Sequence, residues 1–314
     1  MTAPQGTRRP LDAPTQALLA AFAEARGTPI HQMTPAEARE AGSRGWAPLG
    51  TGPQMYEVTE HSVAPGGHVR VRVLRPAEQP CAVLVYLHGG GWVLGDIDGY
   101  DQLGRILAER SGATVVLVNY RKAPEHPFPG PVDDVSAALD WVQAHRDRLA
   151  APDAPLVVAG DSAGGNLAVV AALRARDRGG PVIDKLLLAY PITDCDTSRP
   201  SYLDPDNQLL LGAETMGWFF DHYVGAGDRA DPEVSPLRAE LAGLPDTLLL
   251  LAVHDPLYDE GVAFAERLRA AGVRVEVSTY ADQLHGFVAL VGLLPASDRA
   301  LDELAGAVSR AGRS

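Results

Sequence analysis

The stretch from Leu156 to Asn166, LVVAGDSAGGN, passes from an apolar strand into the pattern G-x-S-x-G and then into a helix. This context predicts a sharp turn on which Ser162 is strained and presents its hydroxyl. The glycines fit the turn, because side chains two residues from the serine on either side would collide. The turn also places Ser162 at a helix N-terminus, where partial positive charge favours a developing anion. An ordinary glycine-rich strand–helix turn is the alternative.

Apolar runs of strand length recur through the chain, and helical segments separate them. We expect strands at Ala82–Leu87, Thr114–Tyr120, Leu156–Ala159, Leu186–Tyr190, Thr247–Val253 and Val273–Thr279, and helices at Leu103–Ser111, Pro131–Leu149, Asn166–Arg178 and Gly261–Ala271. Strands that are apolar on both faces and alternate with helices are typical of an α/β fold with a parallel sheet covered on both sides. Ahead of them, Met55–Ser62 and His68–Leu74 alternate in polarity around Ala64-Pro65-Gly66-Gly67, which predicts an antiparallel hairpin.

Two regions lie outside this alternation. An amphipathic helix at Pro14–Arg26 and a capping box at Thr34–Glu37 predict two helices within residues 1–50, separate from the sheet. Between Pro191 and Leu244 no strand is evident, and large side chains gather there: Met216, Trp218, Phe219, Phe220 and Tyr223. An insertion of this length is more often functional than idle. A surface helix packed by its own aromatic residues is the alternative.

The composition argues against several classes of protein. The net charge of −13, with no basic stripe, argues against nucleic-acid binding. No apolar run approaches transmembrane length, and the N-terminal apolar run fits an amphipathic helix better than a signal peptide, so we expect no membrane partner. Cys81 and Cys195 are far apart and predict reduced thiols in a cytoplasmic protein. The histidines form no metal-binding pattern, so we expect neither a metal nor a cofactor.

A serine hydroxyl needs a base to become a good nucleophile. In folds with this kind of turn, the chain order is serine, acid, histidine. Apart from His254, which directly follows Val253, His285 is the only histidine after the Thr247–Val253 strand, so we expect it to be the base. Asp255 follows that strand and is the expected acid. Asp259 and Glu260 compete with it, but they fit better as the N-cap and first-turn residues of the next helix.

Three consecutive glycines follow an earlier apolar strand: Gly89, Gly90 and Gly91. Their unobstructed N–H groups can lie beside Ser162, and the N–H of Ala163 can join them, to stabilise the anion that forms in acyl transfer. A flexible loop or a phosphate-binding loop is the alternative, but neither G-x-G-x-x-G nor Gly-Lys-Ser/Thr is present. We interpret His88 as a structural brace for this loop.

Five stretches together resemble the bacterial hormone-sensitive-lipase family of esterases: HGGGW, YRKAPEHPFPG, GDSAGGN, HDPLYDEG and LHGF. They occur in the order and spacing of the family, and the resemblance covers most of the chain from about Tyr56 onward. It implies an α/β-hydrolase fold at residues 51–314, with a mostly parallel central sheet flanked by helices. It also implies a helical cap, formed by the helices of residues 1–50 and an insertion at about residues 195–243.

The resemblance further implies hydrolysis of carboxylic esters without a cofactor, through Ser162, Asp255 and His285. The family's oxyanion donors fall on Gly90, Gly91 and Ala163, and Gly89 is a further candidate. A small apolar pocket that favours short acyl chains is expected from Trp92, Met216, Trp218, Phe219 and Phe287. Three positions depart from the family pattern, and we expect them to affect substrate preference rather than activity: Tyr100, Lys122 and Tyr258.

The expected partner is a small-molecule ester, and we expect a monomer or a homodimer. Two other functions remain open on the same fold. One is acyl transfer or amide cleavage in a biosynthetic pathway, because fold and triad do not fix the substrate. The other is a non-catalytic ligand-binding protein, against which the presence of His285 argues.

Overall fold

A computed structural model describes residues 7–25, 27–46, 50–64 and 66–311 of the protein. Eight strands form one sheet in the order β1-β2-β4-β3-β5-β6-β7-β8. Their bounds are β1 Glu57–Val63, β2 Val69–Arg75, β3 Val83–Leu87, β4 Thr114–Asn119, β5 Leu156–Asp161, β6 Lys185–Ala189, β7 Asp246–His254 and β8 Val275–Leu284. The β1–β2 and β2–β4 pairs are antiparallel and the others are parallel, which confirms the predicted hairpin and the mostly parallel sheet.

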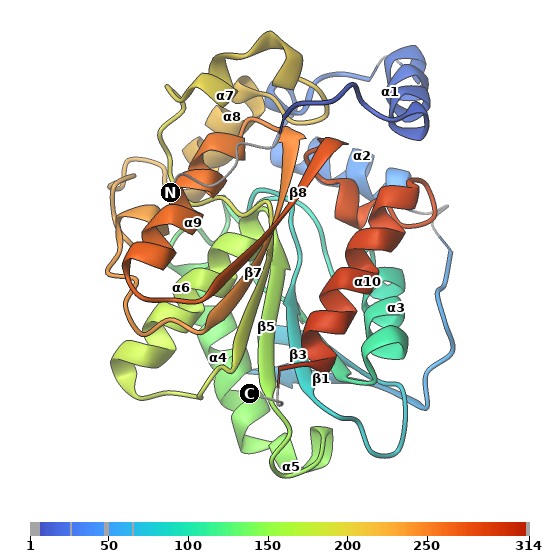
Figure 1. Cartoon of the computed structure of the whole chain (residues 1–314), viewed down its shortest axis with the longest axis vertical. Helices are drawn as coiled ribbons and strands as arrows, with labels where there is room; N and C mark the ends of the chain where they lie inside the picture. The colour runs from blue at the N-terminus through green and yellow to red at the C-terminus, as the bar shows by residue number, and fades with distance from the viewer. Residues whose placement is uncertain (1–6, 26, 47–49, 65, 312–314) are drawn as a thin grey trace.

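Helices cover both faces of this sheet (Figure 1). They are α1 Ala13–Ala25, α2 Pro35–Trp46, α3 Asp101–Ser111, α4 Gly130–Ala144, α5 Arg146–Leu149, α6 Ala163–Arg178, α7 Pro200–Leu203, α8 Ala213–Tyr223, α9 Tyr258–Ala270 and α10 Pro295–Ser309. Short 3-10 turns lie at η1 Ile30–Gln32, η3 Pro205–Asn207, η4 Pro236–Arg238 and η5 Phe287–Ala289. Helices α4, α6 and α9 pack on one face, and α3 and α10 pack on the other.

Alternation along the central strands divides the core between the two faces. In β3, Val83, Val85 and Leu87 belong to the cluster beneath α4 and α6, whereas Leu84 and Tyr86 belong to the cluster beneath α3 and α10. All five side chains are buried. Successive side chains of a strand point to opposite faces, so a strand covered on both sides must be apolar throughout.

Some boundaries differ from the prediction. The helix expected at Pro131–Leu149 is divided, because His145 leaves helical geometry and its ring Nδ1 lies 2.8 Å from the carbonyl oxygen of Trp141. The last strand extends to Leu284, well beyond the predicted end at Thr279. Helix α10 is additional to the helices expected. Arg26, the predicted end of the first helix, and Pro65, in the predicted turn, lie outside the described residues.

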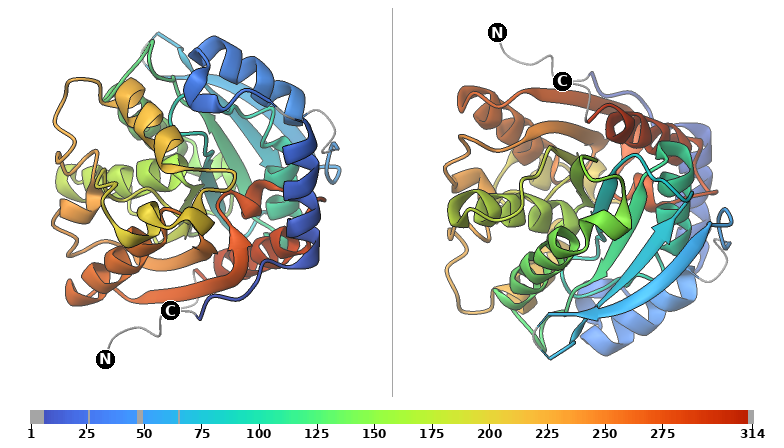
Figure 2. Two further views of the ribbon diagram at one scale, coloured as in Figure 1. Left: turned by 90° about the horizontal axis from the view of Figure 1, so that it is seen from above. Right: turned by 90° about the horizontal axis from the view of Figure 1, so that it is seen from below.

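All strands of the sheet except the antiparallel β2 end at the side of the molecule where α1, α2, α7 and α8 lie (Figure 1). Figure 2, in its left panel, looks down on this end: the two N-terminal helices border it on one side, and the segment with α7 and α8 borders it on another. No strand occurs between β6 and β7, as expected for the described insertion. None of the helices in the described ranges is long and apolar enough to cross a membrane.

Candidate active site

The turn after β5 has the strained geometry that the sequence predicts. Ser162 has φ 55° and ψ −119°, and α6 begins at the next residue. A Cβ atom on Gly160 would lie 2.4 Å from the carbonyl carbon of Gly164, and one on Gly164 would lie 2.0 Å from the carbonyl oxygen of Leu87. Only glycine fits such close approaches. The start of α6 therefore packs directly against the end of β3.

The loops after three strands bring the predicted serine, histidine and aspartate together. His285 Nε2 lies 3.0 Å from Ser162 Oγ, and His285 Nδ1 lies 2.7 Å from Asp255 Oδ2. The other carboxylate oxygen of Asp255 accepts the Leu257 amide at 2.8 Å. Asp255 is 1% exposed and His285 is 11% exposed at their side chains. With Nδ1–H donated to the carboxylate, Nε2 can accept the proton of the serine hydroxyl.

The two competing acidic residues have other partners. Helix α9 begins at Tyr258, so Leu257 occupies the N-cap and the prediction of Asp259 at that position is wrong. Both acidic residues lie in the first turn, as predicted for Glu260. Asp259 Oδ2 accepts the backbone amide of Ser201 at 2.7 Å and so joins α9 to α7.

The first of the three glycines does not offer a free amide. The N–H of Gly89 donates to Asp161 Oδ1 and to the Tyr100 hydroxyl, each at 3.1 Å. Gly89 as an oxyanion donor is therefore wrong: its amide holds the loop in place. Among the described residues, neither the Gly90 nor the Gly91 amide donates to a protein acceptor. Their φ values of +111° and +58° favour glycine, and a Cβ atom on Gly90 would lie only 2.5 Å from the carbonyl oxygen of Leu94.

A buried carboxylate fixes this glycine loop to the turn after β5. Asp161 accepts hydrogen bonds from the hydroxyls of Tyr86 (3.0 Å) and Tyr100 (2.9 Å) as well as from Gly89. Burial raises the pKa of Asp161 to about 6, although these hydrogen bonds act in the opposite direction and lower it. Sequence reasoning missed this role, although Asp161 precedes Ser162 and Tyr100 departs from the family pattern. The network joins the residue before the serine to the loop that carries Gly90.

His88 braces the same loop from the other side. Its ring is buried and stacks on Tyr120 with centroids 4.3 Å apart. Nδ1 lies 2.7 Å from the carbonyl oxygen of Gly89, to which it can donate. Burial, with the nearby charge of Lys122, lowers the pKa of His88 to about 3. The ring is therefore neutral at physiological pH and acts as a brace.

The residues expected to shape a substrate pocket fall into two groups. Trp92 and Phe287 have no exposed surface: the first stacks on Tyr223 with centroids 4.1 Å apart, and the second packs against Tyr190. Both side chains belong to the core, so the prediction that they line a substrate pocket is wrong. Three residues lie on α8: Met216, which is also buried in the core, Trp218 and Phe219. Phe219 covers Gly91, where an added Cβ would lie 2.2 Å from its ring.

A cavity of about 570 Å³ lies beside the glycine loop. Its lining includes Gly90, Arg39 of α2 and two residues that depart from the family pattern, Tyr100 and Lys122. Lys122 Nζ donates to Asn119 Oδ1 at 3.2 Å. Burial lowers the pKa of Lys122 to about 8, so the ammonium is still mostly charged at pH 7. This cavity is the candidate for binding part of a substrate.

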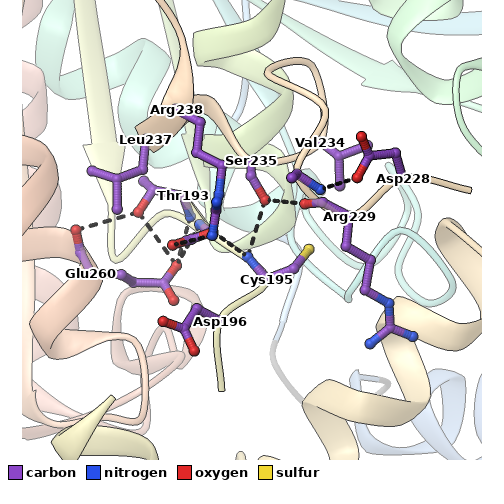
Figure 3. Close-up of polar contacts among 12 residues, drawn as sticks. Thr193, Cys195, Asp196, Asp228, Arg229, Val234, Ser235, Leu237, Arg238 and Glu260 are labelled. Carbon is purple, nitrogen blue, oxygen red and sulfur yellow. Dashed lines mark hydrogen bonds and ion pairs between the residues drawn. The ribbon is translucent and has the colours of Figure 1, made fainter. Parts of the chain in front are cut away.

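Glu260 is a buried acid that the sequence placed only as a first-turn residue of α9. It is fully buried, and Oε1 accepts the amides of Thr193 (2.6 Å) and Asp194 (3.2 Å), in the segment after β6. Figure 3 shows this contact within a polar cluster that also contains Cys195 and Arg238. Oε2 has no partner within the described part of the chain. Burial raises the pKa of Glu260 to about 8, so it carries a proton at neutral pH.

Replacing Glu260 with glutamine should remove a pH dependence of stability. The folded-state pKa, about 8, lies above the usual 4.5, so between these values the folded chain holds a proton that the unfolded chain has released. Raising the pH across this window destabilises the wild type by at most about 1.4 kcal/mol per pH unit. Glutamine keeps the acceptor but does not titrate. Urea unfolding of both proteins from pH 5 to 9 should show that the free energy of unfolding of the wild type falls relative to that of Glu260→Gln as the pH rises. The same pH dependence in both proteins would contradict the prediction.

The described residues contain no group of three or more His, Cys, Asp or Glu side chains that could hold a metal ion. The chemistry that the site supports with its own groups is nucleophilic attack by Ser162, with His285 as base and Asp255 as its partner.

Comparison with known proteins identifies the family. A family model described as alpha/beta hydrolase fold matches residues 84–289. The carboxylesterase NlhH of Mycobacterium tuberculosis (strain CDC 1551 / Oshkosh) is 37% identical over 99% of both chains. An ethyl acetate hydrolase of Pseudomonas putida is 34% identical over 87% of this chain and 89% of its own. The structure of a hyperthermophilic esterase from the archaeon Pyrobaculum calidifontis superposes with a TM-score of 0.90 at 35% identity, covering 96% of this chain and 98% of that one.

These similarities extend over nearly the whole chain and agree with the fold. The matched region runs from β3 to η5 and so includes the loops that carry Ser162, Asp255 and His285. The protein therefore belongs to the hormone-sensitive-lipase-like family of α/β-hydrolases.

Proposed function

We propose that the protein is a serine carboxylesterase that hydrolyses short-chain esters through an acyl-enzyme. The observation that carries this proposal is the hydrogen-bonded chain from Ser162 Oγ through His285 to Asp255, at 3.0 and 2.7 Å. Relatives named carboxylesterase, esterase and ethyl acetate hydrolase support ester hydrolysis as the reaction.

The reaction begins when Ser162 Oγ attacks the ester carbonyl carbon while His285 Nε2 takes its proton. Asp255 keeps the imidazole in the tautomer with hydrogen on Nδ1 and stabilises its positive charge. His285 then donates the proton to the leaving alcohol, and the acyl group stays on the serine. Water attacks this acyl-enzyme with His285 again as base, which releases the acid and restores Ser162.

The backbone amides of Gly90, Gly91 and Ala163 are the proposed donors to the oxyanion. Two of them lie on the glycine loop, which Asp161 and His88 hold in position. The third is the first residue of α6, whose amide has no acceptor within its own helix. Preorganised donors of this kind are each worth about a hundredfold or more in rate.

The helices of residues 1–50 and the insertion at about residues 195–243 form the proposed cap. Helices α2 and α8 contribute to it from opposite parts of the chain, and Phe219 of α8 covers Gly91. We propose that this cover and the cavity lined by Lys122 limit the length of the acyl chain. Both cysteines are free, which fits a cytoplasmic location.

Nitrophenyl esters of graded acyl length test the proposed specificity. We expect kcat/KM to be highest for acetyl to butyryl esters and to fall at least about tenfold by the dodecanoyl ester, because a loss of roughly 1.4 kcal/mol of transition-state binding is a tenfold loss in rate. Initial rates below the micellar concentration of each ester measure this. A preference that rises steadily with acyl length would contradict a short acyl pocket.

A second assay separates hydrolysis from its alternatives on the same nucleophile. The ester, its matching amide and the ester with an added alcohol acceptor are compared. We expect the ester to be cleaved and the free acid to remain the main product when the alcohol is present. Dominant transfer to the alcohol, or faster amide cleavage, would instead support the biosynthetic function that the fold also permits.

A further inference from the structure

The segment before α1 runs along the ends of the two strands that carry the acid and the base. Figure 1 shows it, in dark blue, passing beside the upper ends of β7 and β8. The Arg9 amide donates to the carbonyl oxygen of Ala281 at 3.0 Å, and the Asp12 amide donates to that of Asp282 at 3.3 Å. These bonds attach the N-terminal segment to the extended end of β8, only three residues before His285.

Arg8 and Arg9 bind both nitrogens of His254, the residue immediately before Asp255. Nε2 of His254 lies 2.7 Å from the carbonyl oxygen of Arg9 and donates to it. Nδ1 therefore accepts, and the Arg8 guanidinium lies 3.1 Å from it through Nη2 and 3.3 Å through Nε. The His254 side chain is almost buried. The end of β7 is thus held by the N-terminal segment at the position next to Asp255.

Thr15 makes the corresponding contact beside His285. Its hydroxyl donates to Oε1 of Gln283 at 3.0 Å, and Nε2 of Gln283 donates to Asp12 Oδ2 at 2.9 Å. Thr15 and Gln283 are both fully buried. A buried amide without partners costs its full desolvation, so Gln283 favours the docked segment strongly. Gln283 lies near the end of β8, two residues before His285.

Arg8 also joins this segment to the insertion. Nη1 lies 2.5 Å from Asp204 Oδ2, and Nη2 donates to Asn207 Oδ1 at 3.0 Å. Asn207 is buried and donates to the carbonyl oxygen of Ser201, whose own hydroxyl donates to the carbonyl oxygen of Pro256. The segment around Asp255 is therefore held from two sides by one arginine.

We propose that the segment Arg8–Thr15 is a positioning element for the pair Asp255–His285: Arg8 acts through His254, and Thr15 acts through Gln283. The proposal rests on the proposed function, since it concerns the geometry of that triad. General-base catalysis depends steeply on this geometry, and a misplacement of about 1 Å can cost about a hundredfold in rate. Neither Arg8 nor Thr15 needs to touch the substrate for this effect.

The chain offers a matched control for each contact. Arg8→Ala removes the guanidinium on His254, whereas Arg9→Ala removes an exposed side chain of the same charge and keeps the backbone contact. Thr15→Val removes the buried hydroxyl and keeps the shape, whereas Thr15→Ser keeps the hydroxyl. We expect Arg8→Ala and Thr15→Val to lower kcat about tenfold with KM changed less than about twofold. We expect both controls to stay within about twofold of the wild type.

Two further measurements separate positioning from a loss of fold. All variants are assayed well below their melting temperatures, and the low-field imidazole proton of the Asp255–His285 hydrogen bond is followed by NMR. We expect this resonance to broaden or disappear in Arg8→Ala and Thr15→Val and to persist in the controls. An unchanged kcat, or a resonance that persists in all four variants, would overturn the proposal. Ser162→Ala is assayed in parallel, because activity in that variant would refute the proposed function instead.

Discussion

Replacing Ser162 with alanine should lower kcat for ester hydrolysis by roughly 10⁴- to 10⁶-fold while leaving the fold intact. The hydroxyl oxygen is the atom that would bond to the acyl group, and among the described side chains Ser162 is the hydroxyl that lies 3.0 Å from His285 Nε2. Alanine tolerates the positive φ of Ser162 as well as serine does, and the amide of residue 162 keeps its bond to the carbonyl oxygen of Ala189. The residual rate would come from the oxyanion donors and substrate binding alone.

The measurement is the rate of nitrophenyl butyrate hydrolysis by both proteins, together with the burst that precedes steady turnover. Ser136→Ala is the matched control, since Ser136 lies on α4 and donates only to the carbonyl oxygen of Val132 in its own helix. We expect the burst to disappear in Ser162→Ala and to remain in the control. Ester turnover by Ser162→Ala within tenfold of the wild type would show that the nucleophile is a different group.

Replacing Asp255 with asparagine should lower kcat by about 10⁴-fold, with little change in overall geometry. The Asp255 carboxylate accepts a hydrogen bond from Nδ1–H of His285, with the two heavy atoms 2.7 Å apart. An asparagine in the same place can present its NH₂ group to that nitrogen, which favours the tautomer with hydrogen on Nε2. That tautomer cannot accept the proton of Ser162, and the charged imidazole also loses its anionic partner.

The same substitution at Asp259 is the control for Asp255→Asn. Asp259 lies four residues further along and holds Ser201 rather than the histidine. We expect Asp259→Asn to retain at least about a tenth of the wild-type kcat, since it loosens one contact of α7 and leaves the triad intact. If Asp259→Asn lowered kcat as much as Asp255→Asn does, the assignment of Asp255 as the acid of the triad would be contradicted.

The sequence predicted the parts of the site that depend on local pattern. The glycines around Ser162 are required by backbone approaches below 3 Å, and such constraints leave a clear signature. The strands beneath the site are apolar on both faces and alternate with helices, so their type and order could be inferred. Asp255 and His285 follow from their positions after two of these strands.

Contacts between distant parts of the chain could not be predicted in the same way. The sequence pattern ended the last strand at Thr279, whereas β8 continues to Leu284, where the N-terminal segment bonds to the backbone of Asp282 and to the side chain of Gln283. Glu260 looked like an ordinary first-turn acid, yet it is buried against the segment after β6. Gly89 remained a further candidate for an oxyanion donor, because the sequence does not show that its amide is bound by Asp161. In each case the deciding partner lies more than 60 residues away.

Covalent labelling by an organophosphate ester tests the central claim most directly. The reagent phosphorylates an activated serine and mimics the first step of ester hydrolysis, so labelling depends on nucleophile, base and oxyanion donors together. The account predicts a single phosphoryl adduct on Ser162, identified by mass spectrometry of the peptide that contains GDSAGGN, and a loss of esterase activity in proportion to the adduct. Complete inactivation with the adduct on another residue, or full activity in a protein labelled at Ser162, would contradict it.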